Sequence, residues 1–348
     1  VLQNRINITA DAYRRLADGQ IMKSTVPLET GESSLTTNIG SVQNAGIELG
    51  VNFGVIRNQN FTWDVNVAFA RNWSKIKELP SGDDVSNNWF IGERLNVLRD
   101  YTYAGVITAD GVTMHTINGD KHYTLQEVYD KYGPKSPNKL KWYEGQMAVN
   151  DWNDDGKIND EDKQIYGCTD PKWTGSLSST MTYKGFDFSF MLYTKQGQWS
   201  RSYFHEQYMD ISDRGRQKMS FDYYIPAGTP VLDKATGDIT YLETPHMGAY
   251  PYPNNYEKTG GGYFSKSSSG VRYQKTSFVK VKNITLGYTF PKKWMSKIAV
   301  KHLRLYVNVL NPFCFTGYDG FDPEWASANL TDGGPASVTY QIGANIKF

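Results

Sequence analysis

An acidic segment in the middle of the chain has the residue types and the spacing of a calcium-binding loop. It runs Asp151-Trp-Asn-Asp-Asp-Gly-Lys-Ile-Asn-Asp-Glu-Asp162. In a twelve-residue calcium loop, oxygen ligands come from positions 1, 3, 5, 7, 9 and 12, and a glycine at position 6 makes the sharp turn. Here those positions hold Asp151, Asn153, Asp155, the Lys157 carbonyl, Asn159 and Asp162, with Gly156 at the turn. We expect a structural calcium ion, although aspartate at position 12 closes the site less well than glutamate. The alternative is an Asx-rich turn without a metal.

Outside this loop, no residues in the sequence have the spacing of a metal site or of a catalytic site. The five histidines show no metal-ligand spacing, and neither a Gly-x-Ser-x-Gly elbow nor a phosphate-binding loop is present. Cys168 and Cys314 allow one disulfide, and the sequence leaves open whether they pair. The formal charge of +1, without a Lys/Arg cluster, gives no reason to expect nucleic acid. We predict that the protein is not an enzyme and has no nucleic-acid partner.

Aromatic residues in long polar segments are the other candidate ligand contacts. Aromatic faces with polar edges can stack on sugar rings or pack against peptides and partner proteins. Internal packing of large loops, or an aromatic girdle at a membrane interface, explains such residues equally well. The candidates for substrate or partner contact are Trp89, Trp142, Trp199, Tyr203 and Tyr208.

The elements that hold these segments alternate apolar and polar residues with a period of two, as strands do. At the C-terminus, one face is formed by Val338, Tyr340, Ile342, Ala344, Ile346 and Phe348. The same alternation recurs in residues 4–13, 44–56, 61–70, 173–193, 277–290 and 302–310. Each strand has about ten residues, which is the length that a tilted strand needs to cross a bilayer. No stretch approaches the roughly 18 consecutive apolar residues of a membrane helix.

The connections between these strands are of two kinds, short polar turns and long segments at 17–38, 79–172, 194–274 and 312–336. This asymmetry is typical of outer-membrane barrels, whose long loops are extracellular. The fold class that we predict is all-β: an antiparallel transmembrane β-barrel portion of about eight strands. A soluble sandwich, such as a secreted calcium-dependent lectin, is the alternative. Sandwich strands are usually shorter and seldom expose large apolar residues over ten positions.

Several passages resemble the C-terminal barrel half of the SusC/RagA family of TonB-dependent transporters from Bacteroidetes. They are the strand Asn38-Ile-Gly-Ser-Val-Gln-Asn-Ala-Gly-Ile-Glu-Leu49, the loop Asp155-Gly-Lys-Ile158 with Asp162, Gly167, Pro171 and Lys172 after it, and His302-Leu-Arg-Leu-Tyr-Val-Asn-Val-Leu-Asn311 followed by Phe321-Asp-Pro-Glu324. The chain also ends on an aromatic residue, as the family's barrels do. The resemblance implies that Tyr340, Ile342, Ile346 and Phe348 form the signal read by the barrel-assembly machinery.

The resemblance also implies a function. Residues 1–348 would be the C-terminal part of a receptor barrel of about 22 strands, with large extracellular loops at 79–172 and 194–274; the family's N-terminal plug domain is not found in the sequence. Such a barrel, in the bacterial outer membrane, imports a glycan or oligopeptide under a SusD-like lipoprotein lid. TonB acts through the missing N-terminal region, and the pairs can assemble as a dimer. The alternative is a structural or adhesive surface protein with a calcium-stiffened loop.

Overall fold

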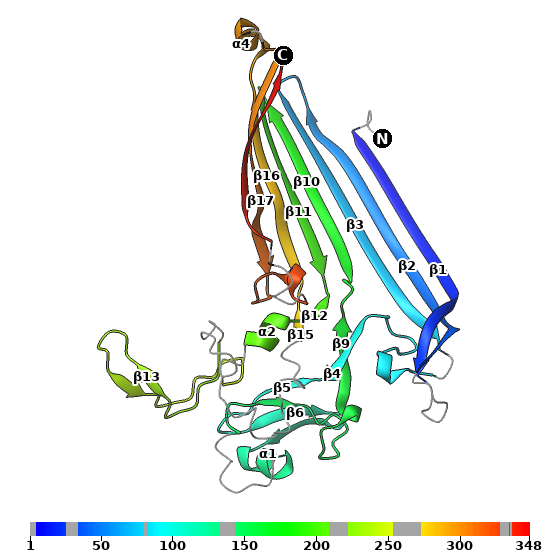
Figure 1. Cartoon of the computed structure of the whole chain (residues 1–348), viewed down its shortest axis with the longest axis vertical. Coiled ribbons are helices and arrows are strands. Elements are labelled where there is room, and N and C mark those ends of the chain that lie inside the picture. The colour runs from blue at the N-terminus through cyan, green and yellow to red at the C-terminus, as the bar shows by residue number, and fades with distance from the viewer. Residues whose placement is uncertain are drawn as a thin grey trace.

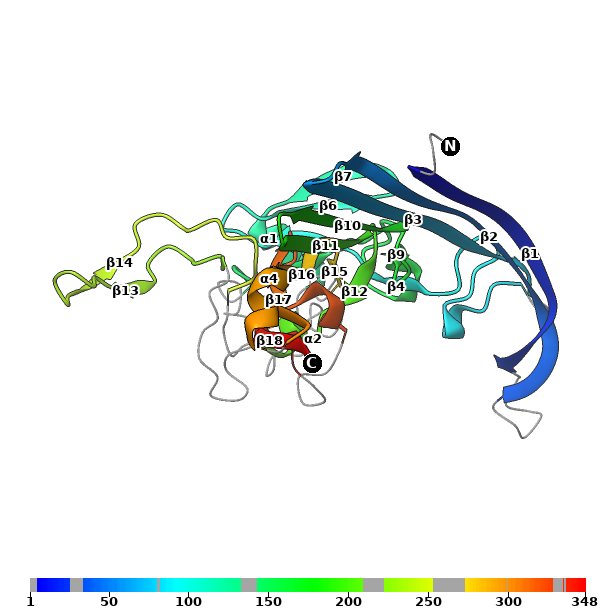
Figure 2. The same cartoon turned by 90° about the horizontal axis from the view of Figure 1, so that it is seen from above.

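The computed structural model describes residues 5–25, 34–79, 82–132, 143–208, 222–252, 273–298, 300–327, 334 and 336–348. Its main feature is one curved sheet of long antiparallel strands (Figures 1 and 2). In their order across the sheet, the strands are β1 (Ile6–Thr25), β2 (Ser34–Arg57), β3 (Phe61–Glu78), β10 (Trp173–Tyr183), β11 (Phe186–Gln196), β16 (Phe278–Thr289), β17 (His302–Thr316) and β18 (Thr339–Lys347). The curvature is that of a barrel wall that does not close on itself.

The strand register gathers the apolar positions of all eight strands on one face. Across β1, β2 and β3, Leu49 lies opposite both Ala10 and Phe69. On the other half of the wall, an unbroken row runs through Phe188, Leu286, Val307 and Ile342. Most of these side chains are exposed in the chain alone, Phe69 is half-buried, and Ile342 is 87% exposed. A face of large apolar side chains without a protein neighbour suits lipid, and the opposite face then lines the lumen.

Aromatic residues mark the two edges of this outward face. Trp63 and Trp73 both lie on it in β3, because they pair with Ile56 and Ala45 of β2. Ten residues at a rise of about 3.3 Å span about 33 Å along the strand, and a tilt of about 40° reduces this to about 25 Å across the membrane. This distance equals the height of the apolar band of outer-membrane barrels.

The two ends of the wall differ in the length of their connections. At the turn end, residues 58–60 and 184–185 join neighbouring strands, and residues 290–301, with helix α4 (Lys292–Met295), form the third connection. At the loop end, residues 79–172, 197–277 and 317–338 connect the strands. In an outer-membrane barrel the loop end is extracellular. The expected loop at 17–38 was wrong, because β1 continues to Thr25 and β2 begins at Ser34. Paired backbone there extends the wall beyond the membrane.

The loops carry small elements of their own below the wall in Figure 1. In chain order these are β4 (Val97–Tyr101), β5 (Tyr103–Val106), β6 (Val112–Thr116), β7 (Gly119–Tyr123), α1 (Leu125–Tyr132), β8 (Met147–Val149), β9 (Lys163–Cys168), β12 (Trp199–Arg201), α2 (Tyr203–Tyr208), β13 (Pro230–Leu232), β14 (Ile239–Tyr241) and β15 (Tyr273–Lys275). The elements from β5 to β8 enclose a separate hydrophobic core that includes Ile107, Met114, Val128, Tyr132 and Val149. The long loop at 79–172 is therefore a folded subdomain. In the described part of the chain, no helix is long and apolar enough to cross a membrane.

Candidate functional site: the lumen face and the extracellular loops

The lumen face of the wall carries small and polar residues. The register aligns Thr9, Asp11 and Tyr13 of β1 with Gly50, Glu48 and Gly46 of β2 and with Ala68, Ala70 and Asn72 of β3. This face is set by the same alternation that turns the apolar side chains outward. It offers hydroxyl, amide and carboxylate groups to whatever passes along or fills the lumen.

Gly46 makes room for a hydrogen bond that joins three strands. The Tyr13 hydroxyl reaches across β2 and donates to Asn72 Oδ1 at 2.9 Å. A Cβ atom on Gly46 would collide with Asn72 Oδ1 and would lie 2.7 Å from the Tyr13 ring. A glycine in a strand interior often marks such a close approach.

A hollow of about 300 Å³ lies next to this bridge, on the same face. The residues that line it include the small Gly50, Ala68 and Ala70 and the carboxylates Asp11 and Glu48. Those two carboxylates lie directly opposite each other in the register. Like charges in that position repel each other. The hollow therefore favours a ligand or protein segment that brings hydrogen-bond donors or positive charge.

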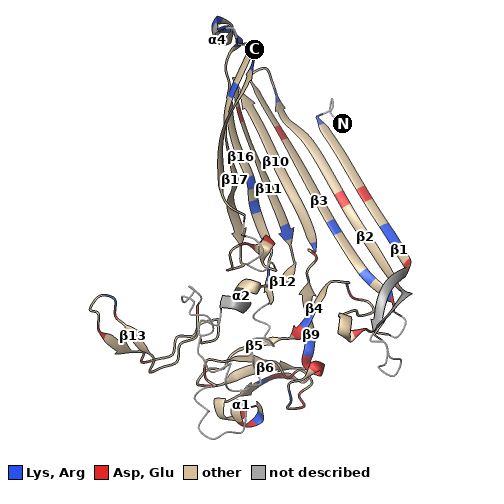
Figure 3. Cartoon of the chain, viewed as in Figure 1, with Lys and Arg blue, Asp and Glu red and all other residues tan. Residues whose placement is uncertain are grey.

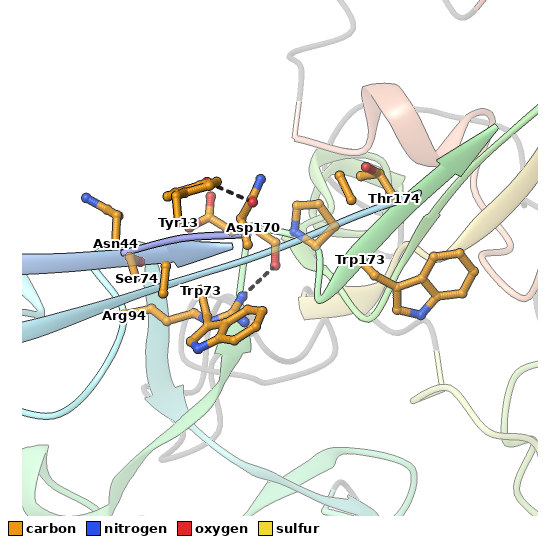
Figure 4. Close-up of a pocket in the computed structure, with 12 residues that line it drawn as sticks. Tyr13, Asn44, Trp73, Ser74, Arg94, Asp170, Trp173 and Thr174 are labelled. Atoms are coloured by element: carbon orange, nitrogen blue, oxygen red, sulfur yellow. Dashed lines mark hydrogen bonds between the residues drawn. The ribbon is translucent and has the colours of Figure 1, made fainter. Parts of the chain in front are cut away.

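A second hollow, of about 260 Å³, lies at the loop end, where β3 loses β10 as its neighbour. Pairing between these strands ends at Ala70 and Thr174. Arg94 and Asp170 border the gap, and Arg94 Nη1 donates to the Asp170 carbonyl at 3.4 Å. In Figure 4 the indole rings of Trp73 and Trp173 point to one side of the strands, while Tyr13 lies on the other.

The predicted calcium loop lies between β8 and β9. Asp151 and Asp162, its first and last positions, are buried. The N–H of Asp155 donates to both Asp151 Oδ1, at 3.2 Å, and Asn153 Oδ1, at 3.1 Å, so these two oxygens converge. Gly156 has a φ of 83°, which a sharp turn needs. The turn and two of the predicted ligands thus adopt the expected arrangement.

Three other predicted ligand side chains, those of Asp155, Asn159 and Asp162, accept hydrogen bonds within the loop itself. Lys157 donates its N–H to Asp155 Oδ1 at 2.8 Å, and Asn159 caps the 3-10 turn Asp160–Asp162. Asp162 accepts hydrogen bonds from the N–H groups of Trp152, Asn153 and Asn159. Burial raises the pKa of Asp162, and these hydrogen bonds oppose the shift only in part.

An internal cation already contacts the loop. Lys131 Nζ of α1 lies 3.3 Å from Asp151 Oδ2, and the Tyr132 hydroxyl donates to the same oxygen at 2.7 Å. Among the described residues, no group of three or more His, Cys, Asp or Glu side chains is placed to hold a metal ion. The carboxylates keep spare lone pairs. A calcium ion would therefore compete with Lys131, and the calcium site stays a prediction.

Three side chains fasten the loop between β17 and β18 to the wall. Lys280 of β16 is buried, and its Nζ contacts both Asp322 oxygens at 3.0 Å and Glu324 Oε2 at 2.5 Å. Lys282 Nζ reaches the same Glu324 oxygen at 2.8 Å. Burial raises the pKa of Glu324, but the two lysines outweigh it and lower that pKa, so Glu324 is ionised at neutral pH. We call Lys280, Asp322 and Glu324 the ion clamp.

A buried hydrogen-bond network joins two loops nearby. The Ser202 hydroxyl lies 2.7 Å from His205 Nδ1 and also 2.7 Å from the Tyr318 hydroxyl. His205 Nε2 lies 2.6 Å from Asp319 Oδ1, and Tyr250 donates to the other Asp319 oxygen at 2.5 Å. Burial raises the pKa of Asp319, but its bonds to His205 and Tyr250 outweigh burial and lower it. Ser202 and His205 are fully buried, whereas the Asp319 side chain is 45% exposed, so the network holds the loops together and places one carboxylate at the surface.

Sequence reasoning missed the ion clamp and this network. Phe321-Asp-Pro-Glu324 was recognised as a family-like motif, which could have suggested that its carboxylates have a partner. Nothing near Lys280 in the sequence marks it as that partner, because 42 positions separate Lys280 from Asp322. The histidines were dismissed for lack of metal spacing, and His205 serves instead as a buried hydrogen-bonding group.

Of the predicted aromatic contacts, Trp89 and Trp199 are half-buried. Trp89 forms a β-bridge with Asp84, and Trp199 of β12 packs on Tyr166, with ring centroids 5.7 Å apart. A Cβ atom on Gly167 would run into the Trp199 indole, so that glycine makes room for the ring. Trp199 therefore joins the loop at 79–172 to the loop at 197–277.

The other aromatic candidates lie at or near α2. Tyr203 and Tyr208 are the first and last residues of that helix, and the Arg201 guanidinium lies 5.1 Å from the centre of the Tyr203 ring. Trp142 lies outside the described residues. Among the described residues, no contact joins Trp89 to Trp199 or to Tyr203, and the role of the five aromatic residues in ligand contact stays a prediction.

The C-terminal residues assigned to barrel assembly lie on the outward face of β18. Tyr340, Ile342, Ile346 and Phe348 are all exposed. On one edge of β18 the ladder to β17 is complete, from Thr339 to Lys347. Recognition of this segment by the assembly machinery stays a prediction. The cysteines are both free, with Cys168 buried on β9 and Cys314 exposed on β17.

No family model matches the chain. Two curated relatives align with all of it: the TonB-dependent receptor P39 of Formosa agariphila, 29% identical, and the TonB-dependent receptor SusC of Bacteroides thetaiotaomicron, 28% identical. The alignments cover 34% and 30% of those proteins, so the chain spans about a third of their length. Both are receptors and not enzymes, which agrees with the prediction from the sequence.

Solved structures are similar in fold. The RagAB peptide transporter superimposes with a TM-score of 0.64 at 18% identity, over 99% of this chain and 34% of that one. The RagAB peptide importer in its closed-closed state gives 0.63 at 19% identity, again over 99% of this chain and 34% of that one. The expected resemblance is confirmed, and with it the outer-membrane β-barrel class.

Proposed function

We propose that this chain forms the C-terminal part of the wall and the extracellular roof of a TonB-dependent importer, which carries a nutrient glycan or oligopeptide across the outer membrane. A SusD-like lipoprotein would cover the roof, and TonB would act through the part of the receptor that precedes this chain. Two such pairs could associate as a dimer. The names of the relatives, which include SusC and the RagAB peptide transporter, support this assignment.

The observation that carries the proposal is the joining of three long loops into one body at the loop end. The ion clamp holds the loop at 317–338 to β16. The His205 network joins that loop to the one at 197–277. Trp199 and Tyr273 pack on Tyr166, which joins the loop at 197–277 to the subdomain at 79–172. Ordered loops above a polar lumen suit selective binding of a large solute.

Filling the lumen hollow should reduce import. A Cβ on Gly50 would meet nothing closer than 3.9 Å, so a side chain can leave the strand there, and the indole of a tryptophan would occupy the hollow. We expect Gly50→Trp, in the full-length receptor, to lower TonB-dependent uptake of a labelled oligosaccharide or oligopeptide by about tenfold, as a loss of about 1.4 kcal/mol in binding does.

The control for this prediction is the adjacent residue on the other face. Val51→Trp places the same side chain toward lipid and should leave uptake unchanged. Heat-modifiable mobility of the receptor in outer-membrane fractions shows whether both variants assemble. Equal uptake by Gly50→Trp and wild type would exclude the hollow from the transport path. Wild-type receptor that takes up neither solute, and that instead binds surfaces in a calcium-dependent way, would favour the adhesive alternative.

We also propose that a calcium ion binds the loop from Asp151 to Asp162 and stabilises the subdomain at 79–172. We expect isothermal titration of the full-length receptor with calcium to show binding that Asp151→Asn abolishes. Lys131→Gln should tighten it about tenfold, because one like charge at this range costs about 1 to 4 kcal/mol.

Lys121→Gln is the matched control for the calcium prediction. Lys121 forms an ion pair with Asp154, which is not a predicted ligand, so its loss should change calcium affinity less than the loss of Lys131. If no heat is exchanged with any of these proteins, the loop is an Asx-rich turn stabilised by its own hydrogen bonds and by Lys131.

A further inference from the structure

Three basic side chains gather on the outward face of β1 and β3, where the apolar band ends. Arg14 lies on that face because it pairs with Ala45 of β2, which in turn pairs with Trp73. Arg71 and Lys75 stand two residues to either side of Trp73, on the same face. Neighbouring strands are about 4.8 Å apart and alternate residues about 7 Å apart. Arg14 is therefore two strands, or about 10 Å, from the β3 residues, a distance that long basic side chains and one lipid headgroup can bridge.

Local contacts hold two of these cations without neutralising them. Arg14 Nη2 donates to Gln43 Oε1 at 2.9 Å, and the Arg71 guanidinium lies 5.2 Å from the centre of the Trp73 ring. All three basic side chains are exposed. Within the described part of the chain, none of them forms an ion pair with a carboxylate. Their charge is available to a group outside the protein.

From residue 6 to 16 of β1, 43 to 53 of β2 and 65 to 75 of β3, the outward face contains no acidic residue; Asp18, whose Oδ1 accepts a hydrogen bond from Ser41 Oγ, and Glu78, the register partner of Ser41, lie just beyond this span. Its positions in the membrane-spanning part of these strands are Ile6, Ile8, Ala10, Ala12, Arg14 and Leu16 in β1, Gln43, Ala45, Ile47, Leu49, Val51 and Phe53 in β2, and Val65, Val67, Phe69, Arg71, Trp73 and Lys75 in β3. Figure 3 shows basic segments near the loop ends of β1 and β3. The carboxylates Asp11 and Glu48, which lie opposite each other in β1 and β2, face the lumen. The cations thus stand at the loop-end edge of the apolar face, interspersed with Leu16 and Trp73.

The basic residues are confined to this part of the wall. At the loop end of β17 and β18, the outward positions hold Phe313, Phe315 and Tyr340 instead. Aromatic residues suffice to anchor a barrel at the membrane interface. Positive charge at that level on β1 and β3 therefore requires a separate explanation, since an exposed cation beside hydrocarbon is costly unless a polar or anionic group meets it.

We propose that Arg14, Arg71 and Lys75 form a binding site for the phosphate headgroup of an anionic lipid in the outer leaflet. Guanidinium groups bind phosphate through paired hydrogen bonds. Basic residues at a membrane surface attract anionic headgroups, and the apolar strip below them would hold the acyl chains. The proposal depends on the membrane placement of the wall and not on import, so it goes beyond the proposed function.

The test is native mass spectrometry of the full-length receptor in detergent with equal amounts of phosphatidylglycerol and phosphatidylcholine. The wild-type receptor should retain phosphatidylglycerol in preference to phosphatidylcholine. Arg14→Gln/Arg71→Gln should weaken that retention by about 25-fold, since each basic residue near an anionic surface contributes about fivefold. Inorganic phosphate at millimolar concentration should not displace the lipid, because it lacks acyl chains.

The matched control removes two cations from the lumen face. Arg15 is the neighbour of Arg14 and faces the lumen with Asn44, and Lys195 faces the lumen at the end of β11. Arg15→Gln/Lys195→Gln has the same net charge as the test variant and should bind phosphatidylglycerol like wild type. Three results would overturn the proposal. They are an equal loss of phosphatidylglycerol binding in both double variants, wild-type retention of phosphatidylglycerol by Arg14→Gln/Arg71→Gln, and equal binding of phosphatidylglycerol and phosphatidylcholine by wild type.

Discussion

Lys280→Met is expected to release the loop at 317–338 from the wall and to lower the free energy of unfolding by about 3 to 5 kcal/mol, the cost of removing one partner from a buried ion pair. Lys280 is 2% exposed as a side chain and is the contact shared by Asp322 and Glu324. Without it, two carboxylates remain in a buried position with only Lys282 nearby. Desolvated charge without a partner is among the largest single causes of instability.

Two measurements on the full-length receptor check this prediction. Limited proteolysis should cut the variant within residues 317–338 under conditions that leave wild type intact, and thermal unfolding should occur at lower temperature. Lys282→Met is the control, because Lys282 is 31% exposed and, among the described residues, its one ion pair is with Glu324. Its effect should stay within about 1 kcal/mol, as for exposed pairs. A Lys280→Met receptor with wild-type protease resistance would mean that other contacts hold the loop.

Val67→Arg is expected to destabilise the barrel by about 2 to 4 kcal/mol, the cost of a basic residue near the bilayer midplane on the lipid face. Val67 lies between Trp63 and Trp73 on β3, and its register partners Val51 and Leu177 are apolar. An arginine there must either meet hydrocarbon or bend to reach water. Urea unfolding of the receptor in liposomes measures the change.

Asn66→Arg is the matched control for Val67→Arg, because it places the same side chain at the same depth on the opposite face. Asn66 faces the lumen and makes only a 3.3 Å hydrogen bond to Ser178. Arginine at this position should cost less than about 1 kcal/mol, since it extends into a polar space. If the two variants were equally stable, the assignment of the faces would be wrong.

The wall was predictable from the sequence because the rule behind it is local. Alternation with a period of two assigns Val67 outward and Asn66 inward whichever strands lie beside them. The same rule placed Tyr340, Ile342 and Ile346 on one face. Local patterns did not set the strand ends, however: β1 and β2 continue beyond the predicted length because each supplies the other's backbone hydrogen bonds.

The calcium loop was predictable in part, for the same reason. Asx turns and the Gly156 turn depend on residues within a few positions of one another, and the structure has both. The contact from Lys131 to Asp151 could not be foreseen, because it depends on how α1 packs against the loop. Because of that contact, a calcium ion would have to compete with the Lys131 ammonium group for the Asp151 carboxylate.

By itself, the sequence determined the class of the protein, the two faces of each strand and the turn of the acidic loop, since each follows from residues that are close along the chain. Only the tertiary structure decided that Lys280 pairs with Asp322 and Glu324, that His205 joins two loops, and that Arg14 lies on the same face as Arg71 and Lys75, two strands away. Those residues lie far apart in sequence, and strand register or loop packing alone brings them together. Charge and hydrogen bonding act over a few ångströms of space, whatever the separation along the chain.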